Sequence, residues 1–234
     1  YDVTISDINK QVTIVGQDNT IFNLMNDLSI NDNVVLYNLI IQSNHTIYNK
    51  DKLRIIHSIL KEGLSISSVN PNLIINRSLV YCAISATNAD LDNNWWGQNT
   101  APYNVDNNII LTLESDESPA VICDDINIIA RMVGANGREY DIPAADFILT
   151  ADTGYFSIDC GKFVDHTVET SYFDATQEGK IYLTVDNETI DYTIYDYDRK
   201  TEVILEPITD IPLGYYVTLN ANVYSVTDSY KDFS

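Results

Sequence analysis

An internal repeat of 20 residues constrains the fold more than any other feature of the sequence. Residues 33–41, 53–61 and 73–81 align without gaps at this spacing. Two aligned columns are apolar, and a third holds small residues that form hydrogen bonds. The columns are Val35, Ile55 and Ile75, preceded by Val15; Leu39, Ile59 and Leu79; and Asn38, Ser58 and Ser78, preceded by Asp18.

A period of this length, with short β-branched runs between Asn, Asp and Ser corners, is typical of a parallel β-helix. The side chains of successive turns stack on one another, so each inward column must stay apolar along its length. Asn and Ser at the corners hydrogen-bond to nearby backbone and tolerate unusual backbone angles. The Leu-x-x-Leu-x-Leu frame of leucine-rich repeats is absent. We therefore predict that residues 1–105 form the end of a right-handed parallel β-helix.

One outward column of this repeat is a candidate binding surface. The 20-residue alignment places Tyr37, His57 and Arg77 in the same column. An exposed ladder of aromatic and hydrogen-bonding groups suits a sugar ring, because the aromatic face packs on C–H bonds while the polar tips reach hydroxyls. Ordinary variety among solvent-facing residues explains the same column, and both interpretations stay open.

The carboxylates of this region do not predict an enzyme. Polysaccharide lyases and hydrolases built on β-helices need carboxylates clustered on adjacent turns, to bind Ca²⁺ or to act as an acid/base pair. The acidic residues of 1–105 are scattered, and the neighbours of Asp32 in its column are Lys52 and Asn72. We expect no catalytic residues here.

The string that contains Trp95 and Trp96 is the most distinctive in the chain. It reads Asn-Asn-Trp-Trp-Gly-Gln-Asn-Thr-Ala-Pro and ends at Pro102. Two adjacent indoles are too large for a repeated inward column, and Gly97 and Pro102 mark turns. We interpret the string as a cap over the apolar end of the β-helix. A sugar-binding platform made by the two indoles is the alternative.

Residues 106–200 predict an Ig-like β-sandwich. Short alternating runs follow one another at the spacing of sandwich strands, separated by turn signals such as Ala-Asn-Gly and Asp-Thr-Gly. The expected strands are 109–113, 126–133, 147–150, 155–158, 167–173, 180–185 and 192–195.

The opening of this segment recurs near residue 201. Residues 111–114 (Leu-Thr-Leu-Glu) match 203–206 (Val-Ile-Leu-Glu) at an offset of 92, and alternate residues of 126–132 match 217–223 at an offset of 91. We therefore expect residues 201–234 to begin a second, incomplete Ig-like repeat. Because the chain starts at Tyr1 rather than Met and ends after about two strands of this repeat, we also expect it to be a piece of a longer array.

The Trp-Trp-Gly string that closes β-helix turns, followed by acidic Ig-like segments, resembles the adhesin-like surface proteins of methanogenic archaea. In that family, pectate-lyase-like β-helix regions precede tandem bacterial Ig-like repeats on a surface-attached stalk. The resemblance implies an extracellular, cell-surface protein that attaches to a glycan or protein of another cell, and it supplies no catalytic residues. The alternatives are part of a lyase-like, polysaccharide-degrading enzyme and a purely structural surface spacer.

Charge excludes a general nucleic-acid binder. The formal net charge is -21, and residues 106–200 alone hold 20 acidic against 6 basic side chains. Nucleic-acid binding needs a cationic face. A solvated acidic surface explains this composition, whereas Ca²⁺ binding at Asp124 and Asp125 or at Asp196 and Asp198 is the alternative. No other cofactor is expected.

Three smaller features complete the expectations from sequence. Cys123 and Cys160 either form one disulfide or stay as free thiols. Asn187 heads the best placed of three Asn-x-Ser/Thr glycosylation patterns, because it lies in a predicted turn. No apolar run approaches the ~20 residues of a membrane span, so we expect no membrane insertion within this segment.

Overall fold

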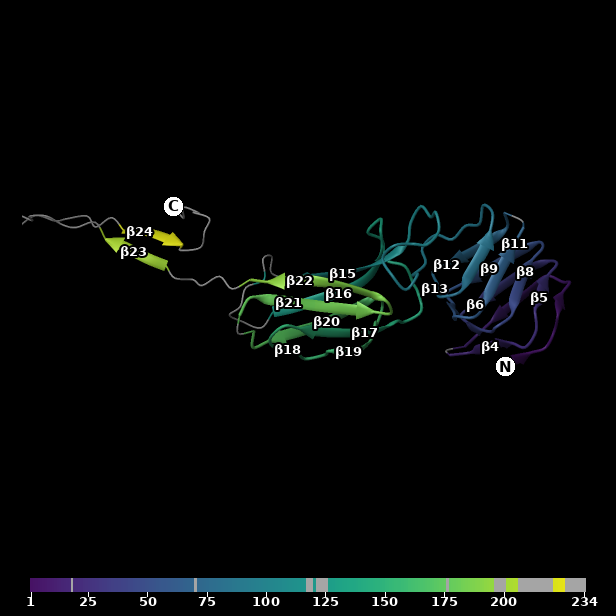
Figure 1. Ribbon diagram of the computed structural model, residues 1–234, viewed down its shortest axis with the longest axis horizontal. Coiled ribbons are helices and arrows are strands. Elements are labelled where there is room, and N and C mark those ends of the chain that lie inside the picture. The colour runs from purple at the N-terminus through teal and green to yellow at the C-terminus, as the bar shows by residue number, and fades with distance from the viewer. Residues whose placement is uncertain are drawn as a thin grey trace, which may run out of the picture.

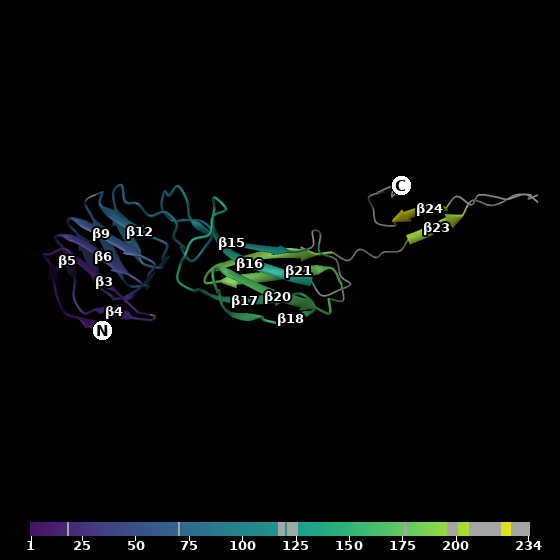
Figure 2. The ribbon, with the colours of Figure 1, turned by 180° about the vertical axis from the view of Figure 1, so that it is seen from behind.

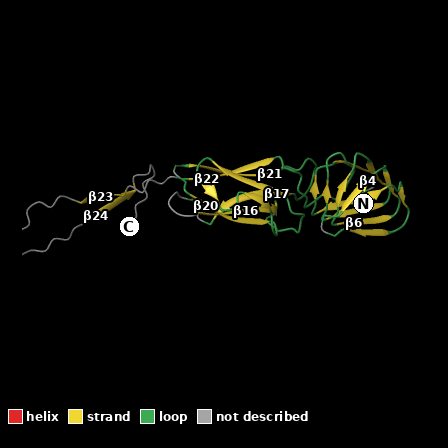
Figure 3. Ribbon diagram, turned by 90° about the horizontal axis from the view of Figure 1, so that it is seen from below, coloured by secondary structure: helices red, strands yellow, loops and turns green. Residues whose placement is uncertain are grey.

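The computed structural model is an all-β protein, a parallel β-solenoid followed by antiparallel sheets (Figure 1). It describes residues 1–17, 19–69, 71–116, 120, 126–175 and 177–195, together with the backbone of two further strands at 201–205 and 221–225. These residues contain strands, turns and loops but no helix (Figure 3).

Three parallel sheets build the solenoid, and each turn adds one short strand to each sheet. About four turns span residues 2–86, which confirms the parallel β-helix predicted from the repeat. The first sheet holds β1 (Asp2–Val3), β4 (Ile21–Leu24), β7 (Ile40–Gln42), β10 (Ile59–Leu60) and β13 (Leu79–Val80). The second holds β2 (Asp7–Ile8), β5 (Leu28–Ile30), β8 (Thr46–Asn49), β11 (Ser65–Ser68) and β14 (Ala83–Ala86). The third holds β3 (Val12–Val15), β6 (Asn33–Tyr37), β9 (Lys52–Ile56) and β12 (Leu73–Asn76), whose strands lie side by side in Figure 2.

The register between turns differs from the uniform spacing of 20. Strands β9 and β12 pair at the predicted offset, with Ile55 opposite Ile75. Strands β6 and β9 pair at an offset of 19, with Leu36 opposite Ile55, so the predicted alignment of Val35 with Ile55 is wrong by one residue. Val15 lies opposite Tyr37 and is 63% exposed, so it does not extend an inward column.

Alternation of side chains explains why a slip of one residue matters. Neighbouring residues of a strand point to opposite faces, so the slip exchanges inside for outside. Val34 and Leu36 are fully buried, whereas Val35 is only partly buried. Columns such as Val34–Leu53–Leu73 therefore stack through the solenoid interior as one continuous core.

The last turn of the solenoid passes into the antiparallel sheets by a ladder of backbone hydrogen bonds. Trp95 N–H donates to Ser78 O at 3.0 Å, and Val80 N–H donates to Trp95 O at 2.8 Å, so 93–95 continues the stack as another rung. Ile109 N–H then donates to Asn94 O at 2.9 Å. The first strand of the next domain thus starts on the end of the solenoid.

Two antiparallel sheets enclose a second core. One has the order β15 (Ile109–Ser115), β16 (Ile126–Gly134), β20 (Thr167–Phe173), β18 (Tyr155–Phe156). The other has the order β19 (Cys160–Lys162), β17 (Asp146–Ala151), β21 (Gly179–Val185), β22 (Glu188–Ile194). Buried and partly buried residues alternate along β16, and its inward side chains share one cluster with those of β21. The seven predicted strands are all present, with shifted ends in most; the sequence did not predict β19, whose three residues are all exposed.

The strands β23 (Thr201–Leu205) and β24 (Ala221–Ser225) form an antiparallel pair of their own. Val203 pairs with Val223 and Leu205 with Ala221. Leu111 pairs with Met132 and Leu113 with Ala130 in β15 and β16, at the same sequence offsets of 92 and 91. The backbone pairing of the first two sandwich strands therefore recurs at the start of the expected second repeat.

Candidate functional site

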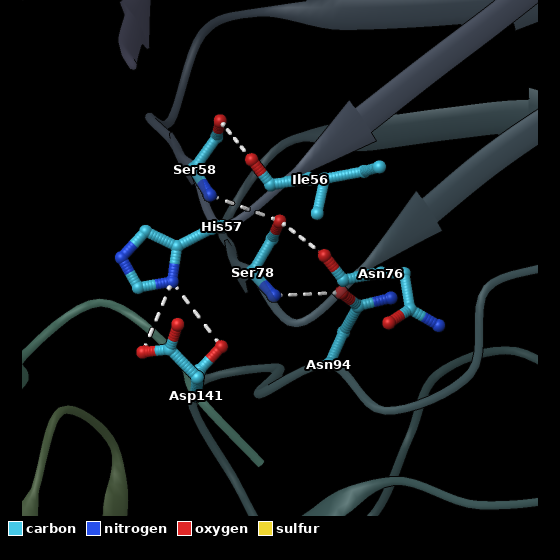
Figure 4. A network of polar contacts seen from close by, with 7 residues as sticks. All are labelled: Ile56, His57, Ser58, Asn76, Ser78, Asn94 and Asp141. Atoms are coloured by element: carbon cyan, nitrogen blue, oxygen red, sulfur yellow. Dashed lines mark hydrogen bonds and ion pairs between the residues drawn. The ribbon is translucent and has the colours of Figure 1, made fainter. Parts of the chain in front are cut away.

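A buried ladder of polar side chains marks the corner between the third and first sheets (Figure 4). The hydroxyl of Ser58 accepts from Leu39 N–H at 3.2 Å, the hydroxyl of Ser78 accepts from Ser58 N–H at 3.1 Å, and Asn94 Oδ1 accepts from Ser78 N–H at 3.0 Å. Each serine hydroxyl also donates to the carbonyl two residues before it. The ladder satisfies buried backbone groups at the turn, so its role is structural.

The residues before this ladder share a left-handed backbone conformation. Asn38, His57, Arg77 and Asn93 have φ values of 54°, 49°, 52° and 58°. The structure therefore places His57 and Arg77 in one column with Asn38, and Tyr37 beside Ile56 in the neighbouring column. The prediction that Tyr37 shares a column with His57 and Arg77 is therefore wrong by one residue, because Asn38 occupies that position. The Tyr37 and His57 rings still stack, with centroids 5.9 Å apart and planes 22° apart.

His57 faces the antiparallel domain. Its Nδ1 lies 3.5 Å from the Asp141 carboxylate and 3.2 Å from the Asp141 carbonyl oxygen (Figure 4). The imidazole is 18% exposed and lies beside a small hollow of about 230 Å³ that Phe163 and His166 also line. His57 therefore joins two parts of the protein and does not belong to an open ladder of sugar-binding groups.

The two tryptophans occupy different cores. Trp95 is fully buried with the antiparallel sheets, and Trp96 is 7% exposed and belongs to the solenoid core, where its ring lies 5.2 Å from Tyr103. Adjacent side chains of an extended segment point to opposite faces, so one dipeptide supplies both cores. The predicted sugar platform is wrong in this form, because neither ring presents an open face to solvent. Trp96 packs as a cap would, and Trp95 belongs to the neighbouring domain.

The Asp186 carboxylate links the two domains through hydrogen bonds. Its Oδ2 accepts a hydrogen bond of 2.7 Å from the Trp95 indole and one of 2.8 Å from the Tyr81 hydroxyl. Asp186 lies in the turn between β21 and β22 with a φ of 53°. Burial raises the pKa of Tyr81, and the Asp186 carboxylate raises it further. The sequence analysis missed this residue, since a turn aspartate gives no signal of a partner in a distant domain.

Two further contacts complete the junction. Asn187 N–H donates to Gly97 O at 3.2 Å, and Gly97 has the φ of 75° that favours glycine. Asn99 N–H donates to the Glu188 carboxylate at 2.9 Å, while Leu111 N–H donates to Asn99 Oδ1 at 2.6 Å. The segment after the tryptophans is thereby bonded to both β15 and β22.

The surface beside this junction is hollowed. A hollow of about 500 Å³ is lined by Tyr81, Trp96, Asp186, Asn187 and solenoid residues that include Lys61 and Glu62. A second hollow of about 550 Å³ lies over earlier turns and is also lined by Lys61 and Glu62. These two hollows form the candidate functional site. The sequence analysis placed only Trp96 in it as a ligand-binding residue.

Of the remaining predicted sites, Asn187 lines the hollow of about 500 Å³, and the others lie outside both hollows or outside the described residues. Cys160 is exposed in β19, and its possible partner Cys123 lies outside the described residues, as do the proposed Ca²⁺ ligands Asp124, Asp125, Asp196 and Asp198. Within the described ranges no group of three or more His, Cys, Asp or Glu side chains could hold a metal ion. Asn187 is exposed in its turn, where glycosylation stays a prediction.

The described part of the chain also has no helix with the length and apolar character that crossing a membrane requires. Comparison with protein-family models, with curated proteins and with solved structures finds no match to this chain.

Proposed function

We propose that this protein is a non-enzymatic cell-surface adhesin, in which a solenoid head on Ig-like repeats attaches to a glycan or protein of another cell. The observation that carries the proposal is the junction at Asp186, where one carboxylate bonds to Tyr81 of the solenoid and to the Trp95 indole packed in the sandwich. A joint with buried aromatic side chains and matched hydrogen bonds holds a binding head at a fixed angle on its support.

Strand order supports the Ig-like assignment. The three long strands of one sheet run in the order β15-β16-β20, and those of the other in the order β17-β21-β22. With β18 taken as strand D and the short edge strand β19 left unlettered, these are the A-B-E and C-F-G groupings of an immunoglobulin sandwich. The short strands β18 and β19 flank these groups at the sheet edges.

The recurrence of the β15–β16 register in β23–β24 supports a stalk of tandem repeats. Repeats that each contact only their neighbours lengthen a stalk without changing its cross-section. The net charge of -21 suits such a stalk at the outside of a cell, because like-charged neighbouring molecules repel one another. These features agree with the resemblance to adhesin-like proteins of methanogenic archaea.

Attachment of protein-coated beads to whole cells tests the proposal. Beads that carry this chain should be retained on layers of microbial cells, methanogenic archaea included, under flow that removes beads coated with an unrelated acidic protein of similar size. Periodate treatment of the cells separates a glycan partner from a protein partner. No retention on any cell layer would favour the structural spacer, and release of unsaturated oligosaccharides from polysaccharides would favour the lyase-like enzyme.

A further inference from the structure

A ladder of outward side chains runs along the solenoid at the end of the first sheet. Asn23 of β4 pairs with Gln42 of β7. Lys61 and Tyr81 follow the paired residues Leu60 and Val80, and their backbone N–H groups continue the ladder at 2.9 Å each. The four residues Asn23, Gln42, Lys61 and Tyr81 therefore occupy one column on four successive turns. We refer to them as the axial ladder.

The two hollows of the candidate site lie along this ladder. Asn23, Gln42 and Lys61 line the hollow of about 550 Å³, and Lys61 and Tyr81 line the one of about 500 Å³. Lys61 and its neighbour Glu62 line both, so the two hollows adjoin along the direction in which the turns stack, and we refer to the pair as the groove. Adjacent strands are about 4.8 Å apart, so the ladder is roughly 14 Å long.

The groove offers hydrogen-bonding groups at one end and aromatic groups at the other. The Asn23 amide is held by a hydrogen bond of 2.9 Å to Asp2, and Gln42 is exposed on the next turn. The Lys61 ammonium lies 5.8 Å from the centre of the Tyr81 ring. Trp96 also lines this end, with its ring buried in the solenoid core and its indole N–H without a hydrogen-bond partner among the described residues.

Backbone pairing argues against an extended peptide as the ligand. A peptide that adds to a sheet needs an unpaired strand edge. Strands β7 and β10 are paired on both sides, so they leave no strand edge to which a peptide could add. Extended peptides advance about 3.3 Å per residue, which does not match groups repeated every 4.8 Å or so. The unit of an extended glycan is close to this spacing.

The charge of the groove favours uncharged glycans over acidic ones. The groove holds one cation, Lys61, against the carboxylates of Glu62 and Asp186, on a chain of net charge -21. This field repels uronates and sulfated sugars. We propose that the groove along Asn23, Gln42, Lys61 and Tyr81 binds an uncharged glycan chain lengthwise. The proposal rests on the adhesin function and names the class of ligand for its head.

Binding of defined oligosaccharides to the whole chain tests the groove. The probes are uncharged oligomers of glucose, mannose and N-acetylglucosamine of two to eight units, with oligogalacturonate as the acidic counterpart. The affinity for the uncharged ligand should rise up to about four units, the number of ladder positions, and then level off. Gln42→Ala/Lys61→Ala should weaken binding about tenfold or more.

A matched control variant is Lys10→Ala/Gln11→Ala, which removes the same two residue types from an exposed site before β3 and outside the lining of either hollow. It should bind as the parent does. Equal binding by the groove variant, a preference for oligogalacturonate, or no binding to any uncharged oligomer would overturn the groove inference. If the groove inference fails but coated beads are still retained on cells, the adhesin proposal stands. If oligosaccharides bind in the groove but beads are retained on no cell, only the adhesin proposal is overturned.

Discussion

The indole N–H of Trp95 donates a hydrogen bond of 2.7 Å to the carboxylate of Asp186, 91 residues further along the chain. The same carboxylate oxygen accepts from Tyr81. One exposed turn residue therefore satisfies two donors that come from separate segments of the solenoid end. The Asp186 side chain therefore contributes two of the hydrogen bonds that join the solenoid end to the antiparallel domain.

Asp186→Asn should lower the free energy of unfolding by about 1–3 kcal/mol, because hydrogen bonds to a charged acceptor become bonds to a neutral one. Asparagine accepts the left-handed backbone of this turn, so the change isolates the charge. Urea denaturation followed by tryptophan fluorescence measures the loss. The control is Asp191→Asn, which breaks an ion pair of 2.9 Å with Lys180 that is about half exposed on both sides. That variant should leave stability nearly unchanged, because solvent screens an exposed pair; an equal loss in both variants would contradict the role of Asp186.

Stability should fall at alkaline pH because of Tyr81. Its pKa is raised in the folded protein by burial and by Asp186, whereas in the unfolded chain it is about 10. The unfolded state therefore loses its proton first, so the contribution is intact below about pH 10 and is lost as the pH rises above it. Urea denaturation at pH 8 and pH 11 should show a smaller decrease for Tyr81→Phe than for the parent. The same decrease in both proteins would show that other groups cause it.

Trp95→Ala and Trp96→Ala should weaken different domains. Each change removes a buried indole and should cost about 3–5 kcal/mol in the core to which that indole belongs. Hydrogen exchange of backbone amides localises the effect: Trp96→Ala should speed exchange in β11 to β14 of the solenoid, and Trp95→Ala should speed exchange in β15 and β22. The corresponding Phe variants should show the same pattern with smaller changes. Identical exchange patterns for the two Ala variants would contradict the division between cores.

Val34→Ala and Val35→Ala test the register of the solenoid. Val34 is fully buried between successive turns, so removing two methyl groups should cost about 1.5 kcal/mol or more. Val35 lies on the outward face and is partly buried, so the same change should cost less than about 1 kcal/mol. Unfolding in urea measures both, and a larger loss for Val35→Ala would support the uniform 20-residue alignment instead.

The sequence was sufficient to predict the architecture, because buried and more exposed residues alternate along the strands of both the solenoid and the antiparallel sheets. Residues 167–173 alternate so regularly that the predicted and observed bounds of β20 agree. The register of residues 33–41 could not be read in the same way. Val34, Val35 and Leu36 are all apolar, so both phases of the alternation look like a core, and only packing against β9 selects one.

The site was harder to predict than the fold, because it depends on residues that are distant in sequence. Asp186 looks like any turn aspartate until the β21–β22 turn meets Tyr81 and Trp95. Trp95 and Trp96 enter different cores because adjacent side chains of an extended segment point to opposite faces. The sequence does not show that a second core lies against the face that Trp95 occupies. The axial ladder was hidden by offsets of 19 and 20 between turns, which a fixed period does not align.

The ladder that passes from Ser78 through Asn94 to Ile109 has a mechanical consequence. In the proposed adhesin, a pull on the antiparallel domain would load the bonds at this junction together with the Asp186 contacts. Because several hydrogen bonds join the two domains, the loss of any one of them leaves the others in place. The proposed adhesin should therefore keep its solenoid in one orientation under a drag force that would reorient a domain on a flexible linker.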